Sequence, residues 1–205
     1  MTAKPLIYLA SASPRRSQLL SQIGVAHAVR PAALDESVQP GEDPATYVER
    51  LAQSKAEAVW EQLATEDRLP VLGADTTVAL GKQLLGKPAN AIESRAMLAQ
   101  LSGRTHQVFT AVALCSDAGC EARVSVSNVT FRDLTAREMD AYAATPEPLD
   151  KAGGYAVQGL AAVFITRIAG SYSGIMGLPL SETAELLAAI GWAPFAAAVR
   201  SGAAT

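Results

Sequence analysis

Short apolar runs alternate with helix-start signals along this chain, and this alternation constrains the fold more than any other feature. Residues 6–10 form an apolar run that predicts a strand, and Ser13-Pro14 then supplies the residue types favoured at the start of a helix, which Gly24 ends. A second helix is expected from Asp43-Pro44 to about residue 64. Residues 71–74 predict a buried strand, which residues 76–80 either continue or do not, and the order of elements favours a mixed α/β fold.

The second half of the chain continues the alternation. Two capping boxes, Asn90 with Glu93 and Thr135 with Glu138, predict helix starts, and Gly103 is expected to end the first of these helices. The later expectations are a hairpin of residues 105–116 and 121–131 around Asp117-Ala118-Gly119, a loop over 145–154, strand-like sequence to 168, a helix over 179–191 and a fraying tail beyond Pro194.

The composition excludes several classes of protein. With 49% hydrophobic residues in 205, the chain can fill a core, while its net charge of −3 does not suit coating nucleic acid or an anionic membrane. A local basic cluster would therefore indicate a small anionic ligand. The apolar stretch near the N-terminus is too short for a signal peptide and no run is long enough to span a bilayer, so we expect a cytoplasmic protein. Cys115 and Cys120 are accordingly expected to be free thiols, and too few ligands are near them for zinc.

The junction between the first strand and the first helix, residues 11–16, reads S-A-S-P-R-R. Helix N-termini expose unpaired N–H groups and partial positive charge, so Arg15 and Arg16 in the first turn are unfavourable by about 0.3–1 kcal/mol each. A bound anion would turn that cost into an attraction. The alternative is a solvated basic turn.

Lys55 and Asp75 are the next candidates. Lys55 shares the apolar stripe of its helix with Leu51 and Val59, so its ammonium either reaches the rim of the protein or enters a cleft. Asp75 ends the apolar run V-L-G-A, and ligands of α/β sheets gather where strands end. An aspartate there suits a metal ligand or a general base, and the alternative is an aspartate that caps its own turn.

Three further features are weaker. Residues 81–87 match G-x-x-x-x-G-K, but Pro88 replaces the Ser or Thr of a P-loop, so we expect a hairpin in which Lys87 reaches a phosphate only as a point charge. Glu36 precedes the second helix and is either a magnesium ligand or an exposed loop acid. The glycine-rich residues 170–179 either approach a ligand or form a flexible connection.

The order of these motifs resembles the Maf family of nucleotide pyrophosphatases over residues 6–190. The motifs are, in order, L-A-S-A-S-P-R-R-S-Q-L-L, L-G-A-D-T-T-V, G-K-P, L-S-G-R-T-H-Q-V-F-T-A-V, D-K-A-G-G-Y-A-V-Q-G and G-S-Y-S-G-I-M-G-L-P-L. The resemblance implies a Maf/inosine-triphosphatase-like architecture, in which a central mixed sheet flanked by helices forms two lobes with a cleft. It also implies one domain spanning residues 1–205 and a homodimer.

The resemblance also implies roles for individual residues. Asp75 matches the family's proton acceptor, and positions tied to substrate choice match Arg15, Thr76 and Gln158. Other matches are a basic pocket of Arg16, Lys55 and Lys87, and a metal-side carboxylate at Glu36, so that Glu36 and Asp75 would bind a divalent cation, Mg²⁺ or Mn²⁺.

The expected reaction is hydrolysis of dTTP and UTP to the monophosphate and diphosphate, because the Q-G after Val157 resembles that branch of the family. Such an enzyme would clear non-standard nucleotides from the pool. Two alternatives stay open at this point. One is a nucleotide-binding regulator of septum formation, a process with which the family is linked, and the other is the same reaction on 7-methyl-GTP or modified pyrimidine nucleotides.

Overall fold

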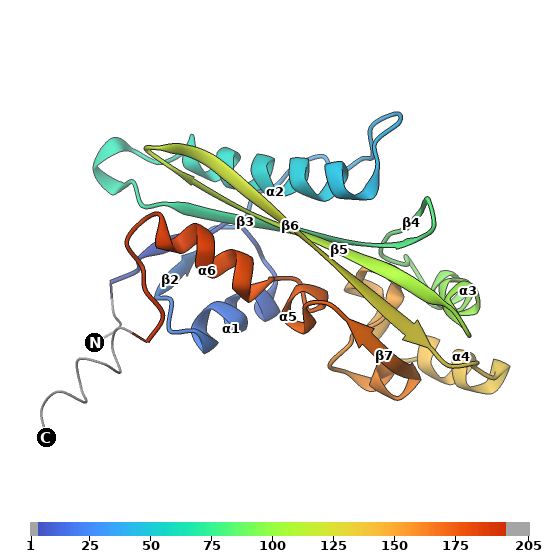
Figure 1. Ribbon diagram of the computed structural model, residues 1–205. Helices are drawn as coiled ribbons and strands as arrows, with labels where there is room; N and C mark the ends of the chain where they lie inside the picture. The colour runs from blue at the N-terminus through green and yellow to red at the C-terminus, as the bar shows by residue number, and fades with distance from the viewer. Residues whose placement is uncertain (1–3, 196–205) are drawn as a thin grey trace, which may run out of the picture.

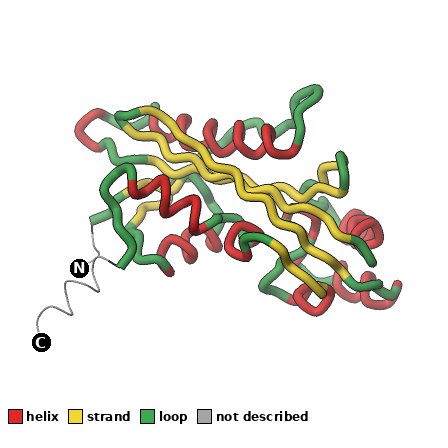
Figure 2. The backbone as a smooth tube through the Cα atoms, in the orientation of Figure 1, coloured by secondary structure: helices red, strands yellow, loops and turns green. Residues whose placement is uncertain are grey.

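The computed structural model describes residues 4–195, which surround a seven-stranded sheet (Figures 1 and 2). The strands follow the order β2-β1-β3-β5-β6-β7, and β4 pairs with β3 outside that path. Their bounds are β1 Ile7–Leu9, β2 His27–Val29, β3 Val71–Leu80, β4 Gln83–Leu85, β5 Thr105–Ser116, β6 Gly119–Phe131 and β7 Ile165–Ala169. β1 runs parallel to β2 and β3, whereas the other pairs are antiparallel, so the sheet is mixed as the sequence predicts.

Helices cover both faces of this sheet. The α-helices are α1 Pro14–Gln22, α2 Pro44–Trp60, α3 Ala91–Leu101, α4 Ala136–Ala143, α5 Tyr172–Ile175 and α6 Leu180–Ala188. Figure 1 shows α2 along one face, α1 and α6 on the other, and α3 and α4 together at the far end of the long strands. Within residues 4–195, no helix is both long and apolar enough to cross a membrane.

Three clusters of buried side chains follow this arrangement. α1 and α6 pack on β1 and on one face of β3 through residues such as Leu20, Leu72 and Leu187. The other face of β3 and β5 packs under α2 through Val48 and its neighbours on the helix. α3, α4 and β6 enclose a separate cluster around Phe131. The first two clusters thus lie on opposite faces of the sheet at one end, and the third lies at the other end. This agrees with the α/β architecture expected from the sequence.

Close packing of α2 on β3 depends on Gly73. A Cβ placed on Gly73 would lie 2.8 Å from the backbone nitrogen of Ala56 and closer still to the carbonyl oxygen of Ala52. Both contacts are with helix backbone, which cannot rotate away as a side chain can. The glycine therefore sets how near the helix and the strand can approach each other.

The structure adds one strand and differs from three expectations in detail. β2 was not predicted, because its residues are only half-buried or exposed and carry no apolar run. In the segment after 154 that was expected to be strand-like, Leu160–Phe164 instead form a 3₁₀ helix, and only β7 is a strand. Residues 170–179 include α5, and the last helix ends at Ala188, before Gly191. The tail expected to fray lies mostly outside the described residues.

The two cysteines are not free thiols in this structure. Cys115 and Cys120 are joined in a disulfide, with their Cα atoms 4.0 Å apart. The register of the predicted β5–β6 hairpin places them directly opposite each other, beside the turn at Asp117-Ala118. The expectation was wrong because it rested on the cellular compartment, although the predicted hairpin already places the two cysteines on adjacent strands.

Gly73→Ala should lower the free energy of unfolding by about 1–3 kcal/mol, because its methyl group collides with the backbone of α2. Urea unfolding followed by circular dichroism measures the change. Gly86→Ala is the matched control, since a Cβ there meets no atom within 4 Å; its stability should stay within about 0.5 kcal/mol of the wild type. Equal stability of the two variants would contradict the packing account.

Candidate active site

The candidate site lies along an open edge of β3. On that edge β1 pairs with Val71 and Leu72, whereas β4 pairs with residues 78–80. In the described part of the chain, residues 73–77 have no strand partner on this edge. The loop after β1 begins beside this unpaired stretch, where the backbone N–H of Ala10 donates to the carbonyl oxygen of Leu72 at 2.8 Å. Side chains from this loop and from both faces of β3 can therefore meet at one edge.

Asp75 and Thr76 point to opposite faces of β3, as successive strand residues must. Asp75 faces α2, where it contacts Lys55, whereas Thr76 faces α1, where it contacts Arg16. Asp75 lies in the middle of β3, not at the strand end that the sequence predicted. The strand end near Asp75 is that of the neighbouring strand β1. β1 stops at Leu9 and so leaves the edge of β3 beside Asp75 unpaired.

Arg16 is fixed in place by three hydrogen bonds. Its guanidinium donates to the carbonyl oxygen of Gly177 at 2.8 Å, to Oγ of Ser11 at 3.0 Å and to Oγ1 of Thr76 at 3.3 Å. Burial lowers its pKa below the ordinary arginine value, although the nearby Asp75 opposes this effect. An arginine stays protonated under such a shift, so the first turn of α1 presents a fixed positive charge. All its partners are neutral, which leaves that charge available to an anion.

Lys55 joins the two predicted carboxylates. Its Nζ lies 2.6 Å from Oδ1 of Asp75 and 2.6 Å from Oε1 of Glu36. Lys55 is 8% exposed and Asp75 is 6% exposed. Of the two alternatives for this lysine, the structure therefore selects the one in which the ammonium points inward.

The two carboxylates have different electrostatic environments. Burial raises the pKa of Asp75 above its usual value, and the positive charges of Lys55 and Arg16 offset that rise only in part. Burial also acts on Glu36, but the hydrogen bond and charge of Lys55 outweigh it, so the pKa of Glu36 lies below its usual value. Asp75 is thus the more basic of the pair and the better proton acceptor.

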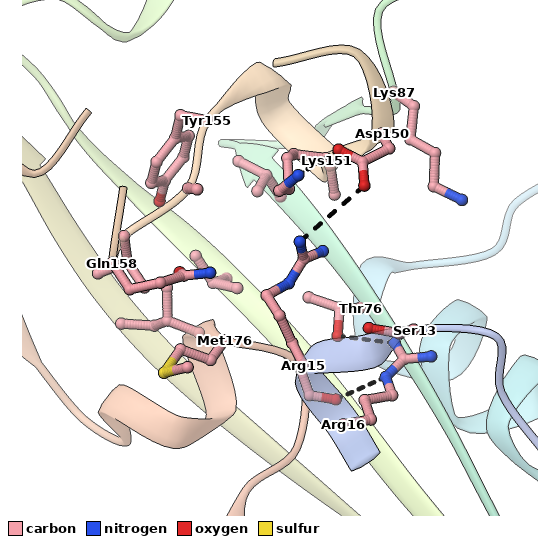
Figure 3. Close-up of a pocket in the computed structure, with 17 residues that line it drawn as sticks. Ser13, Arg15, Arg16, Thr76, Lys87, Asp150, Lys151, Tyr155, Gln158 and Met176 are labelled. Atoms are coloured by element: carbon pink, nitrogen blue, oxygen red, sulfur yellow. Dashed lines mark hydrogen bonds and ion pairs between the residues drawn. The ribbon is translucent and has the colours of Figure 1, made fainter. Parts of the chain in front are cut away.

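Two adjoining hollows open beside these residues. The first, here called the basic hollow, is lined by Ser11 and its neighbours in the β1–α1 loop, by Glu36, and by Lys55 of α2. The second, here called the Gln158 hollow, is lined by Thr76, Lys151, Tyr155, Val157, Gln158 and Met176 among others (Figure 3). Both hollows share Ser13, Arg15, Arg16, Lys87 and Asp150. Seven of the eight predicted site residues thus line one cleft, and the eighth, Asp75, contacts Lys55 of its lining.

Sequence reasoning missed several residues that line the cleft. Asp150 and Lys151 form an ion pair, and Arg15 approaches Asp150 at 4.0 Å. Tyr155 lines the Gln158 hollow and its hydroxyl is 2.7 Å from Nε2 of His106. These residues lie in the family motif D-K-A-G-G-Y-A-V-Q-G, from which only Gln158 was assigned a role, and the periodicity of this segment singled out none of the other side chains.

Glu36 and Asp75 could hold a divalent cation. Each has one carboxylate oxygen engaged by Lys55, which leaves the second oxygen of each for another cation. Magnesium often binds through one or two carboxylates together with water and substrate phosphates, so this donor set fits. Elsewhere in residues 4–195, a group of three possible ligands joins Glu57 to Cys115 and Cys120, but the disulfide occupies both sulfurs.

Comparisons with known proteins place the chain in a family. The model of the family described as Maf-like protein matches residues 6–190. A dTTP/UTP pyrophosphatase of Pseudoalteromonas atlantica is 51% identical over 89% of this chain and 95% of its own length. A dTTP/UTP pyrophosphatase of Aromatoleum aromaticum is 52% identical over 91% of this chain and 96% of its own. A third relative with that name, from Cupriavidus metallidurans, is 51% identical over 89% and 95%.

Lys55→Met should raise the pKa of Asp75 further, because it removes the nearest positive charge and the hydrogen bond that oppose the effect of burial. NMR titration of ¹³C-labelled aspartate carboxyls measures the change, with Asp75→Asn to identify the resonance. Lys55→Arg retains the charge and should leave the pKa near the wild-type value. Lys82→Met, at an exposed turn, is the control. An unchanged or lower pKa in Lys55→Met would contradict the assignment.

Proposed function

The chain belongs to the Maf-like protein family, and we propose that it hydrolyses dTTP and UTP to dTMP or UMP and diphosphate. Relatives about half identical over nearly their whole length carry the name dTTP/UTP pyrophosphatase, which supports the choice of substrate. The observation that carries the proposal is Asp75, a buried carboxylate of raised pKa beside a hollow lined by four cationic side chains. A general base next to a polyanion site suits phosphoanhydride hydrolysis.

The basic hollow would hold the triphosphate. Arg15 and Arg16 lie at the start of α1, and Lys87 extends from the loop after β4 on the opposite side. Guanidinium groups bind phosphate oxygens in pairs, and an ammonium adds a point charge. Lys55 is already held by two carboxylates, so we assign it mainly to positioning Asp75.

Asp75 would take the proton from the attacking water. A carboxylate whose pKa is raised is a stronger base and accepts a proton more readily. The water would attack the α-phosphorus in line with the bond to the leaving diphosphate. Arg16, fixed by three hydrogen bonds, would neutralise charge on the phosphoryl oxygens without moving.

A divalent cation completes the proposal. Glu36 and Asp75 would hold it through the carboxylate oxygens that Lys55 does not engage. When bound, Mg²⁺ or Mn²⁺ would supply additional positive charge at the phosphate oxygens. We also propose a homodimer, which the family resemblance implies, and a location in the cytoplasm.

The Gln158 hollow would hold the base. A glutamine amide offers one donor and one acceptor group, which match O4 and N3–H of uracil and thymine. Neither atom senses the 5-methyl group or the ribose hydroxyl, so both dTTP and UTP would be accepted. Arg15 and Thr76 line the same hollow and are the other residues that we propose contribute to substrate choice.

The proposal predicts rapid release of diphosphate from dTTP and UTP with Mg²⁺ or Mn²⁺, and loss of activity with chelator. Asp75→Asn should lower turnover at least about 10²-fold, because it removes the general base. Asp117→Asn, in the β5–β6 turn, is the matched control. Near-wild-type turnover of Asp75→Asn would overturn the base assignment. Binding of UTP without any diphosphate release would favour a regulatory, non-catalytic protein.

CTP should be a poor substrate, because cytosine presents a donor at position 4 and an acceptor at N3. We expect kcat/KM for CTP to be at least about tenfold below that for UTP, the effect of one mismatched hydrogen bond. Gln158→Ala should reduce this preference by lowering UTP turnover. A nucleoside triphosphate panel measured by diphosphate release tests both points. Equal use of CTP and UTP by the wild type would contradict the role of Gln158.

A further inference from the structure

Lys151 is an inward-facing cation that no step of the proposed reaction uses. Its side chain is 14% exposed, and its Nζ forms an ion pair with Oδ1 of Asp150. The other oxygen of that carboxylate lies 4.0 Å from the guanidinium of Arg15. In Figure 3 the Lys151 amine and the Gln158 amide lie to the same side of Asp150, beside Arg15. One carboxylate thus links two cations at the junction of the hollows, and the three groups keep a net positive charge.

The backbone around Lys151 is tightly held. Its N–H donates to the carbonyl oxygen of Pro148 at 3.2 Å, and its own carbonyl accepts from Gly154 at 3.0 Å. Gly153 donates to the carbonyl oxygen of Gly86, next to Lys87, at 2.9 Å. The φ of Gly153 is 70°, and a Cβ there would lie 2.9 Å from the side chain of Val78. These contacts fasten the turn that carries Lys151 to β3 and β4.

Burial of a lysine stem on a fixed backbone costs side-chain entropy and hydration of the ammonium. An exposed ion pair with Asp150 would form without either of these costs. Such surface pairs also contribute little stability, so the pair alone does not offset the burial. A ligand that accepts hydrogen bonds from the ammonium would offset the cost. This makes Lys151 a candidate for binding substrate.

The lining of the two hollows indicates which part of a nucleotide Lys151 would meet. Arg15 and Asp150 line both hollows, whereas Lys151 lines only the Gln158 hollow. An ammonium has three donors and no acceptor. Asp150 accepts from one of these donors, which leaves the other two for a ligand in the Gln158 hollow. In the proposed function, the Gln158 hollow is the part of the cleft that holds the nucleoside.

We propose that Lys151 is a substrate-binding residue that donates hydrogen bonds to an oxygen of the nucleoside, a base carbonyl or a ribose oxygen, and that Asp150 holds its ammonium in place. The inference rests on the proposed pyrophosphatase function for its choice of ligand. Lys151 would not touch the reacting phosphorus. Its loss should therefore weaken binding of the nucleotide and leave the chemical step nearly unchanged.

The test compares Lys151→Met with the exposed-lysine control Lys82→Met. For Lys151→Met we expect KM for UTP to rise about tenfold, the value of one charge-assisted hydrogen bond, with kcat within about twofold of the wild type. Inorganic tripolyphosphate, which has no nucleoside, should inhibit this variant as well as it inhibits the wild type. Lys151→Arg should recover part of the lost affinity. Melting temperatures establish that the variants are folded.

Two results would overturn the proposal. If KM for UTP and the inhibition constant of tripolyphosphate rise together, Lys151 binds phosphate; if neither changes, it has only a structural role. Calorimetric binding of UTP to the same variants separates this question from the proposed function. A wild type that binds UTP without releasing diphosphate contradicts the reaction, whereas the affinity of Lys151→Met still decides the role of Lys151. A wild type that neither binds nor cleaves UTP contradicts both.

Discussion

The ion pair between Lys55 and Asp75 is the contact on which the rest of the site depends. Both groups are nearly buried, and removing one partner of such a pair commonly costs about 3–5 kcal/mol. The pair can form only where α2 lies close against β3, and Gly73 permits that approach because any Cβ would strike the helix backbone. The position of the proposed base is therefore set by helix–sheet packing, with Glu36 as a second anion on the same ammonium.

The interruption in strand pairing explains how separate segments of the chain reach one cleft. β1 ends early and β4 starts late along the same edge of β3, so the middle of that strand is open beside the β1–α1 loop. Because side chains alternate along a strand, the edge offers Asp75 to one face and Thr76 to the other. The basic hollow and the Gln158 hollow meet at Arg15, Arg16 and Lys87, where the proposed reaction would separate the diphosphate from the nucleoside monophosphate.

Much of this arrangement could be predicted from local sequence. The helix stripe that carries Lys55 places it inward, and the apolar run before Asp75 places that residue in a buried strand, because both signals are periodic. The mid-strand position of Asp75, the edge strand β2 and the Cys115–Cys120 disulfide depend on pairing between segments, which periodicity does not report. Lys151 was missed for a related reason, since its inward orientation comes from turns that tie its loop to Gly86.

The central claim is that a water next to Asp75 attacks the α-phosphorus of the nucleoside triphosphate. Hydrolysis of UTP in water enriched in ¹⁸O, followed by mass spectrometry of both products, tests this most directly. The account predicts that the label enters UMP and that the diphosphate stays unlabelled. Label found in the diphosphate would place the attack at the β-phosphorus and contradict the proposed alignment of Asp75 with the substrate.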